Sequence, residues 1–199
     1  EGQPLGVPMA SGGPYFGFMC CKQAYIRQMP GRIVGRSHDE DGKVGYCLTL
    51  QAREQHIRRA KATSNICTNQ GLLVTAATIY MSLLGAQGLR QVAMQCHQHA
   101  KQLAMSLAAL EGVELVSTSA FFHEFVITLP QPVSSVLHKL AKQDIQGGFD
   151  LSSHFPALGN ALLVCSTEMH EPDDHHRYQL ALTAALTQTN GAEQEAQAC

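Results

Sequence analysis

The segment from Gly71 to Leu84 constrains the fold of this chain more than any other part of the sequence. It is apolar almost all the way round a helix, with Thr75, Thr78 and Ser82 as its one polar stripe. Leaving such a helix in water would forgo about 1.5–3 kcal/mol for each large side chain. We therefore expect neighbouring elements to bury it, and we expect Gly85 to end it in a left-handed conformation.

The composition argues against several classes of protein. The apolar run ends well short of the ~20 residues of a membrane-spanning helix, so membrane insertion is not expected. A net charge of −2 with 15% charged residues gives no field that would attract nucleic acid or anionic lipid. The seven cysteines form no CxxC pair and no disulfide spacing, which indicates a reducing, cytoplasmic location. The sequence begins with Glu1 and not with Met, and no signal sequence follows. We therefore interpret this start as an internal cut in a longer chain.

Hydrophobic periodicity and turn residues predict the order of the elements. Before Gln70 the sequence predicts a strand, a short helix, a β-hairpin turning at Asp41-Gly42, and a second helix: Tyr15–Cys20, Lys22–Gln28, Arg32–Leu50 and Ala52–Ala62. After the apolar helix it predicts a long amphipathic helix and then strand, strand, helix, strand, helix: Leu89–Leu110, Val113–Val116, Phe121–Leu129, Val133–Gln146, Leu162–Cys165 and Asp173–Leu186. We place a domain boundary near Gln70, an α+β domain over residues 71–187, and a disordered tail over residues 188–199, which lacks large apolar residues.

The segment from Gln51 to Gln70 is the most site-like part of the chain. Its single acid, Glu54, is outnumbered by four basic residues: Arg53, Arg58, Arg59 and Lys61. Short hydrogen-bonding residues follow, which are suited to helix capping and anion contacts: Thr63, Ser64, Asn65, Thr68 and Asn69. The sequence from Arg53 to Arg59 and the sequence Lys61-Ala-Thr-Ser-Asn-Ile-Cys-Thr-Asn-Gln70 resemble glycine decarboxylase, the P protein of the glycine cleavage system. They are most similar to the first of the two subunits found where that enzyme is split.

The resemblance covers nearly the whole chain. Further matches are Gly12-Gly13-Pro14, Arg27 to Gly35, Leu48 to Gln51 and Asn160 to Glu168, and small departures occur at Ala52, Ala60 and Gly71. It implies an α/β fold of the pyridoxal-phosphate (PLP)-dependent transferase type (fold type I), with residues 1–70 closing the large domain and residues 71–187 forming the small C-terminal domain. It also implies an oxidoreductase of glycine catabolism, which decarboxylates glycine on PLP and passes the aminomethyl group to the lipoyl arm of the H protein.

The resemblance also indicates where the cofactor lysine should lie. In the catalytic half of the family this lysine precedes one proline by five residues and the proline of Gly-Gly-Pro by eleven. Pro8 and Pro14 hold those positions here, and the lysine position falls on Gln3. Because the amide lone pair is delocalised into the carbonyl, Gln3 cannot form a Schiff base. The resemblance therefore implies a chain without catalytic or cofactor-binding residues, whose partner, subunit 2, binds PLP.

Other interpretations stay open at this stage. Lys61 is the best remaining amine for a free-standing PLP enzyme, although we favour a solvated or anion-contacting lysine. Cys67 precedes a helix that could activate its thiol, but we favour a packing role for it as a small buried side chain. A scaffold module that retains the fold without a decarboxylase partner is the main alternative function. The candidate contacts to the active site or to a partner are polar residues of the motif: Arg53, His56, Arg58, Ser64, Asn65 and Asn69.

We predict no metal site from the ten histidines. On a helix His97 and His99 stand about 200° apart and cannot bind one ion together. His170, His175 and His176 lie beside several acids, but they lack the regular spacing of zinc ligands. We interpret Glu171-Pro-Asp-Asp as the start of a helix, with its acids near the positive end of the helix dipole.

Overall fold

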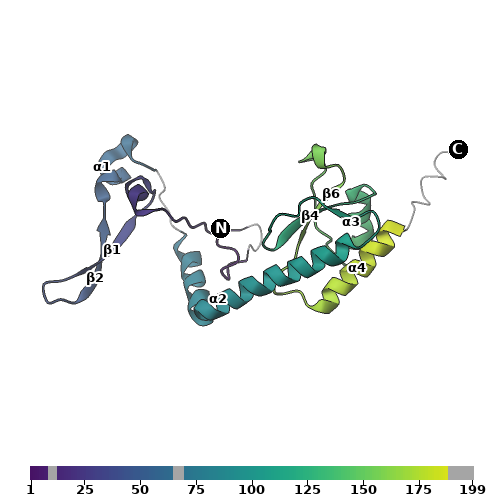
Figure 1. Cartoon of the computed structure of the whole chain (residues 1–199). Helices are drawn as coiled ribbons and strands as arrows, with labels where there is room; N and C mark the ends of the chain where they lie inside the picture. The colour runs from purple at the N-terminus through teal and green to yellow at the C-terminus, as the bar shows by residue number, and fades with distance from the viewer. Residues whose placement is uncertain (9–12, 65–69, 188–199) are drawn as a thin grey trace. The chain divides into compact units, whose positions relative to one another are not determined.

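The structure is a computed structural model that describes residues 1–8, 13–64 and 70–187 (Figure 1). It divides into two compact units, an N-terminal unit from Glu1 to Ala86 and a C-terminal unit from Gln87 onward. The division falls beyond the boundary expected near Gln70, because the beginning of the apolar helix packs with the N-terminal unit. The tail predicted over residues 188–199 lies outside the described residues.

The predicted hairpin is confirmed in the N-terminal unit. Strand β1 (Ile33–His38) pairs antiparallel with β2 (Val44–Thr49) in a register from Ile33↔Thr49 to His38↔Val44. At the turn, the Asp39 carboxylate accepts hydrogen bonds from the backbone N–H groups of Asp41 (3.0 Å) and Lys43 (2.8 Å). Gly42 adopts a φ of 76°, a conformation that glycine reaches without strain.

Two other local predictions for this unit are wrong. Residues 15–20 form no paired strand, although Phe16 is buried and accepts a backbone hydrogen bond from Gly2 at 2.7 Å. The helix expected over 52–62 is divided into short pieces, because Arg59 has a left-handed φ of 52°. The pieces are 3-10 helix η2 (Gln51–Arg53), α1 (Gln55–Arg58) and η3 (Arg59–Lys61). The short helix predicted over residues 22–28 is present as the 3-10 helix η1 (Gln23–Gln28).

Helix α2 (Gly71–Ala108) contains both predicted long helices. They are separated at Gly85, as predicted, where φ is 63° and ψ is −178°. The first part packs weakly: Ala77 is buried with Val7 and Phe16, but Leu72 and Leu83 are 83% and 81% exposed. The burial expected from the sequence is therefore not supplied by the described residues of this chain.

By length and composition alone, α2 meets the requirements for a membrane span. An 18-residue window reaches a mean hydropathy of 1.5 with 6% of it buried. The non-helical backbone at Gly85 interrupts the helix, and core helices of soluble proteins have similar compositions. The absence of a membrane role therefore stays a prediction.

The C-terminal unit is built on a four-stranded antiparallel sheet in the order β3-β4-β6-β5. Its strands are β3 (Glu114–Leu115), β4 (Glu124–Thr128), β5 (Phe149–Asp150) and β6 (Ala161–Cys165). The remaining elements are α3 (Val133–Ala141), the 3-10 helix η4 (Pro156–Leu158) and α4 (Pro172–Thr187). The predicted element order is confirmed, with β5 as an addition that is too short to have a sequence pattern.

One face of this sheet forms the core. Phe125 pairs with Val164 and Ile127 pairs with Leu162, and all four side chains are buried. The second part of α2, α3 and α4 contribute the buried residues packed against them, among them Leu107, Val136 and Leu182 (Figure 1). Because side chains alternate along a strand, Glu124 and Cys165 occupy the opposite face and are exposed at one end of the β4–β6 pair.

Helix α4 offers a direct test of this core. Leu182 is fully buried and Leu180 on the same helix is 57% exposed. We expect Leu182→Ala to lower the free energy of unfolding by about 2–5 kcal/mol through the cavity it leaves, and Leu180→Ala to change it by less than ~1 kcal/mol. Urea denaturation followed by circular dichroism measures both. Equal effects for the two leucines would contradict the packing described above.

Candidate functional site

Arg53 is the buried residue among the described residues of the predicted motif, and its contacts are within its own chain. Its guanidinium is buried and donates hydrogen bonds to the carbonyl oxygens of Met29 and Gly31, the latter at 2.6 Å. It also lies 3.3 Å from the Glu54 carboxylate. Arg53 thus ties the polar motif to the segment before the hairpin through two charge-assisted hydrogen bonds.

The rest of the motif is more exposed. His56 lies 3.4 Å from the side-chain oxygen of Gln51, and Arg58 is exposed on α1. Arg59 and Lys61 are exposed as well, and Ser64 is partly buried. Asn65 and Asn69, together with Cys67 and Thr68, lie outside the described residues. The assignment of these residues to an active site or partner contact stays a prediction.

The position expected for a cofactor lysine has no amine. Gln3 is exposed, and its backbone N–H donates to the Glu1 carboxylate at 3.1 Å. No lysine precedes Lys22 in the sequence. The residues around Gln3 therefore do not fit a covalent PLP site, in agreement with the amide chemistry argued from the sequence.

Three histidine rings lie near one another beside a buried serine that follows β6. The hydroxyl of Ser166, which is fully buried, lies 2.8 Å from Nε2 of His175. The rings of His99 and His170 lie 5.6 and 6.3 Å from that of His175. Burial is the main cause that lowers the pKa of His175, and the charges of His99 and His170 lower it further, against a smaller opposite effect of Asp174. A neutral His175 can accept a hydrogen bond from the Ser166 hydroxyl.

Hydrogen bonds to the backbone hold the histidines of α2, and an acidic side chain caps the start of α4. His97 and His99 contact separate carbonyl oxygens, those of Phe122 (3.1 Å) and Thr167 (3.0 Å). Helix α4 starts at Pro172 with Asp173 and Asp174 in its first turn, and Asp174 accepts from the Glu171 N–H at 2.9 Å. The predicted helix start at Glu171-Pro-Asp-Asp is therefore confirmed.

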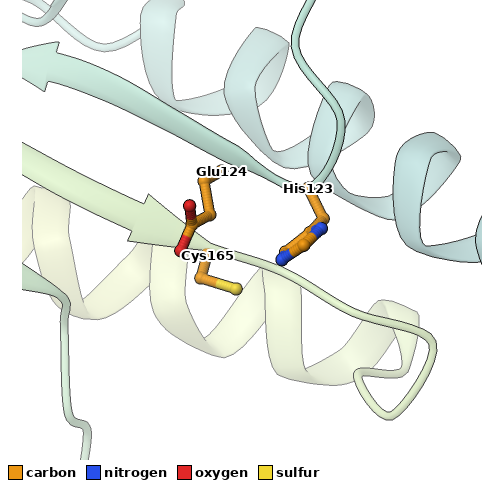
Figure 2. Close-up of side chains that lie close together, drawn as sticks. All are labelled: His123, Glu124 and Cys165. Atoms are coloured by element: carbon orange, nitrogen blue, oxygen red, sulfur yellow. The ribbon is translucent and has the colours of Figure 1, made fainter. Parts of the chain in front are cut away.

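The structure brings together one group that the sequence analysis missed. The side chains of His123, Glu124 and Cys165 offer a nitrogen, an oxygen and a sulfur atom that all lie within 4.8 Å of one another (Figure 2). Partial burial of the sulfur atom, followed by the charge of the Glu124 carboxylate, raises the pKa of the Cys165 thiol. Only strand register could have revealed this group, because Glu124 and Cys165 are cross-strand partners that lie far apart in the sequence.

A cavity of about 640 Å³ lies beside this group. Its lining comes from the ends of β4 and β6, the loop before β5, and α4, and includes Glu124, Gly147, Cys165, His175 and Tyr178. The Tyr178 hydroxyl donates to the Gly147 carbonyl at 2.6 Å, which holds the loop against α4. Burial also raises the pKa of Tyr178, so this hydroxyl keeps its proton at neutral pH.

Comparison with known proteins supplies the family. Residues 1–174 match the family model described as the glycine cleavage system P-protein. The chain belongs to this family. It is 62% identical over 187 residues to a Legionella pneumophila (strain Paris) protein named "Probable glycine dehydrogenase (decarboxylating) subunit 1", covering 94% of this chain and 41% of that protein. A Coxiella burnetii protein of the same name is 62% identical over 182 residues, covering 92% and 41%.

A solved P-protein structure shares the fold. The crystal structure of glycine decarboxylase (P-protein) in inhibitor-bound form superposes with a TM-score of 0.84 at 41% identity, covering 94% of this chain and 42% of that chain. The fold class and the family predicted from the sequence are thereby confirmed. The present chain spans about two fifths of the length of these relatives.

The anchoring role of Arg53 leads to a prediction about stability. Arg53→Lys keeps the charge but cannot reach both carbonyls with one planar fork, and each lost charge-assisted bond is worth about 1.5–3 kcal/mol. We expect faster amide hydrogen exchange in the β1–β2 hairpin and η2. Arg58→Lys, at an exposed position on the next helix, is the control and should leave exchange unchanged. Identical exchange in both variants would show that the contacts of Arg53 do not hold the hairpin.

The lowered pKa of His175 predicts a pH dependence of stability. Its pKa in the folded chain lies below the ~6.5 of an exposed imidazole, so the unfolded chain binds the proton more readily. The resulting stability is complete above about pH 6.5 and declines as the pH falls through the folded pKa. We expect His175→Gln to reduce the fall in thermal midpoint on acidification, and we expect the exposed neighbour His176→Gln to leave it unchanged. Parallel midpoint curves for wild type and His175→Gln would refute this assignment.

Proposed function

We propose that this chain is part of subunit 1 of a glycine dehydrogenase (decarboxylating). As part of the glycine cleavage system in the cytoplasm, it supports PLP-dependent decarboxylation of glycine and transfer of the aminomethyl group to the lipoyl group of the H protein. The observation that carries the proposal is the 62% identity, over nearly the whole chain, to proteins named as subunit 1.

The proposal assigns the cofactor to the partner, subunit 2. When bound, PLP supplies an electron-withdrawing ring that accepts the electrons released as carbon dioxide leaves. Gln3 stands where the resemblance places the Schiff-base lysine, and an amide cannot take that role. The contribution of this chain is therefore to position and cover residues of the partner.

Two surfaces support such a contribution. His56 and Arg58 are exposed on a motif that Arg53 holds to the hairpin, so their side chains are available to another chain. The first part of α2 exposes large apolar side chains, including Leu72, Ile79 and Leu83. Large exposed apolar surface commonly marks a protein interface. We propose that Arg53 orders the motif, and that His56, Arg58, Ser64, Asn65 and Asn69 face subunit 2 or its active site.

Borohydride trapping tests the division of roles. In the complete subunit 1 mixed with its lysine-bearing partner and PLP, we expect reduction to attach the cofactor in stoichiometric amount to one lysine of the partner. We expect only scattered, substoichiometric labelling of this chain. Peptide mass spectrometry locates the label, and decarboxylation of glycine with excess H protein shows that the complex is active.

Lys61→Arg is the matched control, because it keeps the charge of the motif and removes its amine. The variant should leave both labelling and decarboxylation unchanged. Stoichiometric label on Lys61 would instead identify a free-standing PLP enzyme. A chain that neither binds subunit 2 nor supports decarboxylation would identify the scaffold alternative.

A further inference from the structure

The His123, Glu124 and Cys165 group is held in place by the sheet itself. Glu124 and Cys165 are directly paired across β4 and β6, and their side chains occupy the same face. His123 precedes β4, and its carbonyl accepts a hydrogen bond from the Ser166 N–H at 3.0 Å, which continues the ladder. The backbone positions of all three residues are therefore fixed by strand pairing, which gives more precise placement than a loop would.

One atom of this group lacks a partner. Nδ1 of His123 is buried and makes no hydrogen bond within the described part of the chain. The ring packs edge-on against Phe122, with centroids 4.7 Å apart, so a neighbouring aromatic side chain covers it. Buried polar atoms of proteins are almost always paired, so the His123 ring has an unmet hydrogen bond in this chain. Figure 2 shows the nitrogen at the far end of the His123 ring directed towards the thiol of Cys165.

The three donors differ in a way that selects the kind of ion. Imidazole nitrogen, thiolate sulfur and carboxylate oxygen are the three side-chain ligand types of Zn²⁺, whereas Mg²⁺ and Ca²⁺ take oxygen ligands. The ligand atoms lie within 4.8 Å of one another, so side-chain rotation can bring all three to zinc-bond distances of about 2.0–2.3 Å. Glu124 and Cys165 are exposed, so their side chains have room to rotate and the ion has a path from solvent.

We propose that His123, Glu124 and Cys165 form a three-ligand site for Zn²⁺. A tetrahedral ion bound by three protein ligands keeps a fourth position for water or another donor. Glu124 and Cys165 also line the 640 Å³ cavity, so this fourth position has space beside it. The site is independent of the proposed decarboxylase role. It departs from our sequence-based expectation of no metal, which considered His97, His99 and the histidines from His170 to His176.

Zinc titration of the chain tests the proposal. With the metal-free protein and a competing chromophoric chelator, we expect one equivalent of Zn²⁺ to bind. Cys165→Ser and His123→Gln should each weaken that equivalent by roughly tenfold or more, because each removes a direct ligand. Zinc should raise the thermal midpoint of the wild type but not of these variants. Cobalt in place of zinc should give thiolate-to-metal absorption that Cys165→Ser abolishes.

Other cysteines provide the controls. The adjacent, exposed thiols of Cys20 and Cys21 are the main competing site, so a Cys20→Ser, Cys21→Ser double variant should keep the tight equivalent. Cys47→Ser, at another exposed cysteine, should also keep it. Circular dichroism checks that every variant folds. Absence of a tight equivalent in the wild type, or its loss in the double variant together with retention in Cys165→Ser, would overturn the proposal. Zinc protection of Cys165 from alkylation gives an independent readout if either ligand variant unfolds.

Discussion

The antiparallel pairing of β4 with β6 is the interaction on which the C-terminal unit depends. Its register sets Phe125 opposite Val164 and Ile127 opposite Leu162, and these pairs form the buried face covered by helices. A slip of one residue would turn the whole apolar set to the other face. The same register aligns Glu124 with Cys165 on the outer face. The strand pairing that stabilises the domain therefore also brings His123, Glu124 and Cys165 together.

The N-terminal unit is held together differently, because it has little apolar core. Its buried cluster consists of Val7, Phe16 and Ala77 with a few partly buried neighbours. Arg53 compensates by donating to two backbone carbonyls of the segment before β1. A planar guanidinium is well suited to such a bridge, because its donors lie in a rigid fork. Arg53 therefore orders the motif, and the exposed side chains beside it remain available for contacts with other molecules.

How far the sequence predicts this structure depends on the range of the interactions. The hairpin turn at Asp41-Gly42, the break at Gly85 and the start of α4 were predictable, because local backbone preferences determine them. Short β5 was not, since its pairing with β6 decides it, and no local pattern indicates the positive φ of Arg59. The family resemblance gave the fold, the missing lysine and the motif. It gave no indication of the group around Cys165, which exists only through pairing of distant strands.

The exposed apolar face of α2 connects the fold to the proposed assembly. Leu72 and Leu83 are more than four-fifths exposed in this chain, although burial of each is worth about 1.5–3 kcal/mol. The few side chains packed on this part of α2 cannot remove that surface from water. Relatives of this chain are more than twice as long, since the match covers 41% of their length. Under the proposed assembly, the rest of subunit 1 or the partner subunit covers this face of α2.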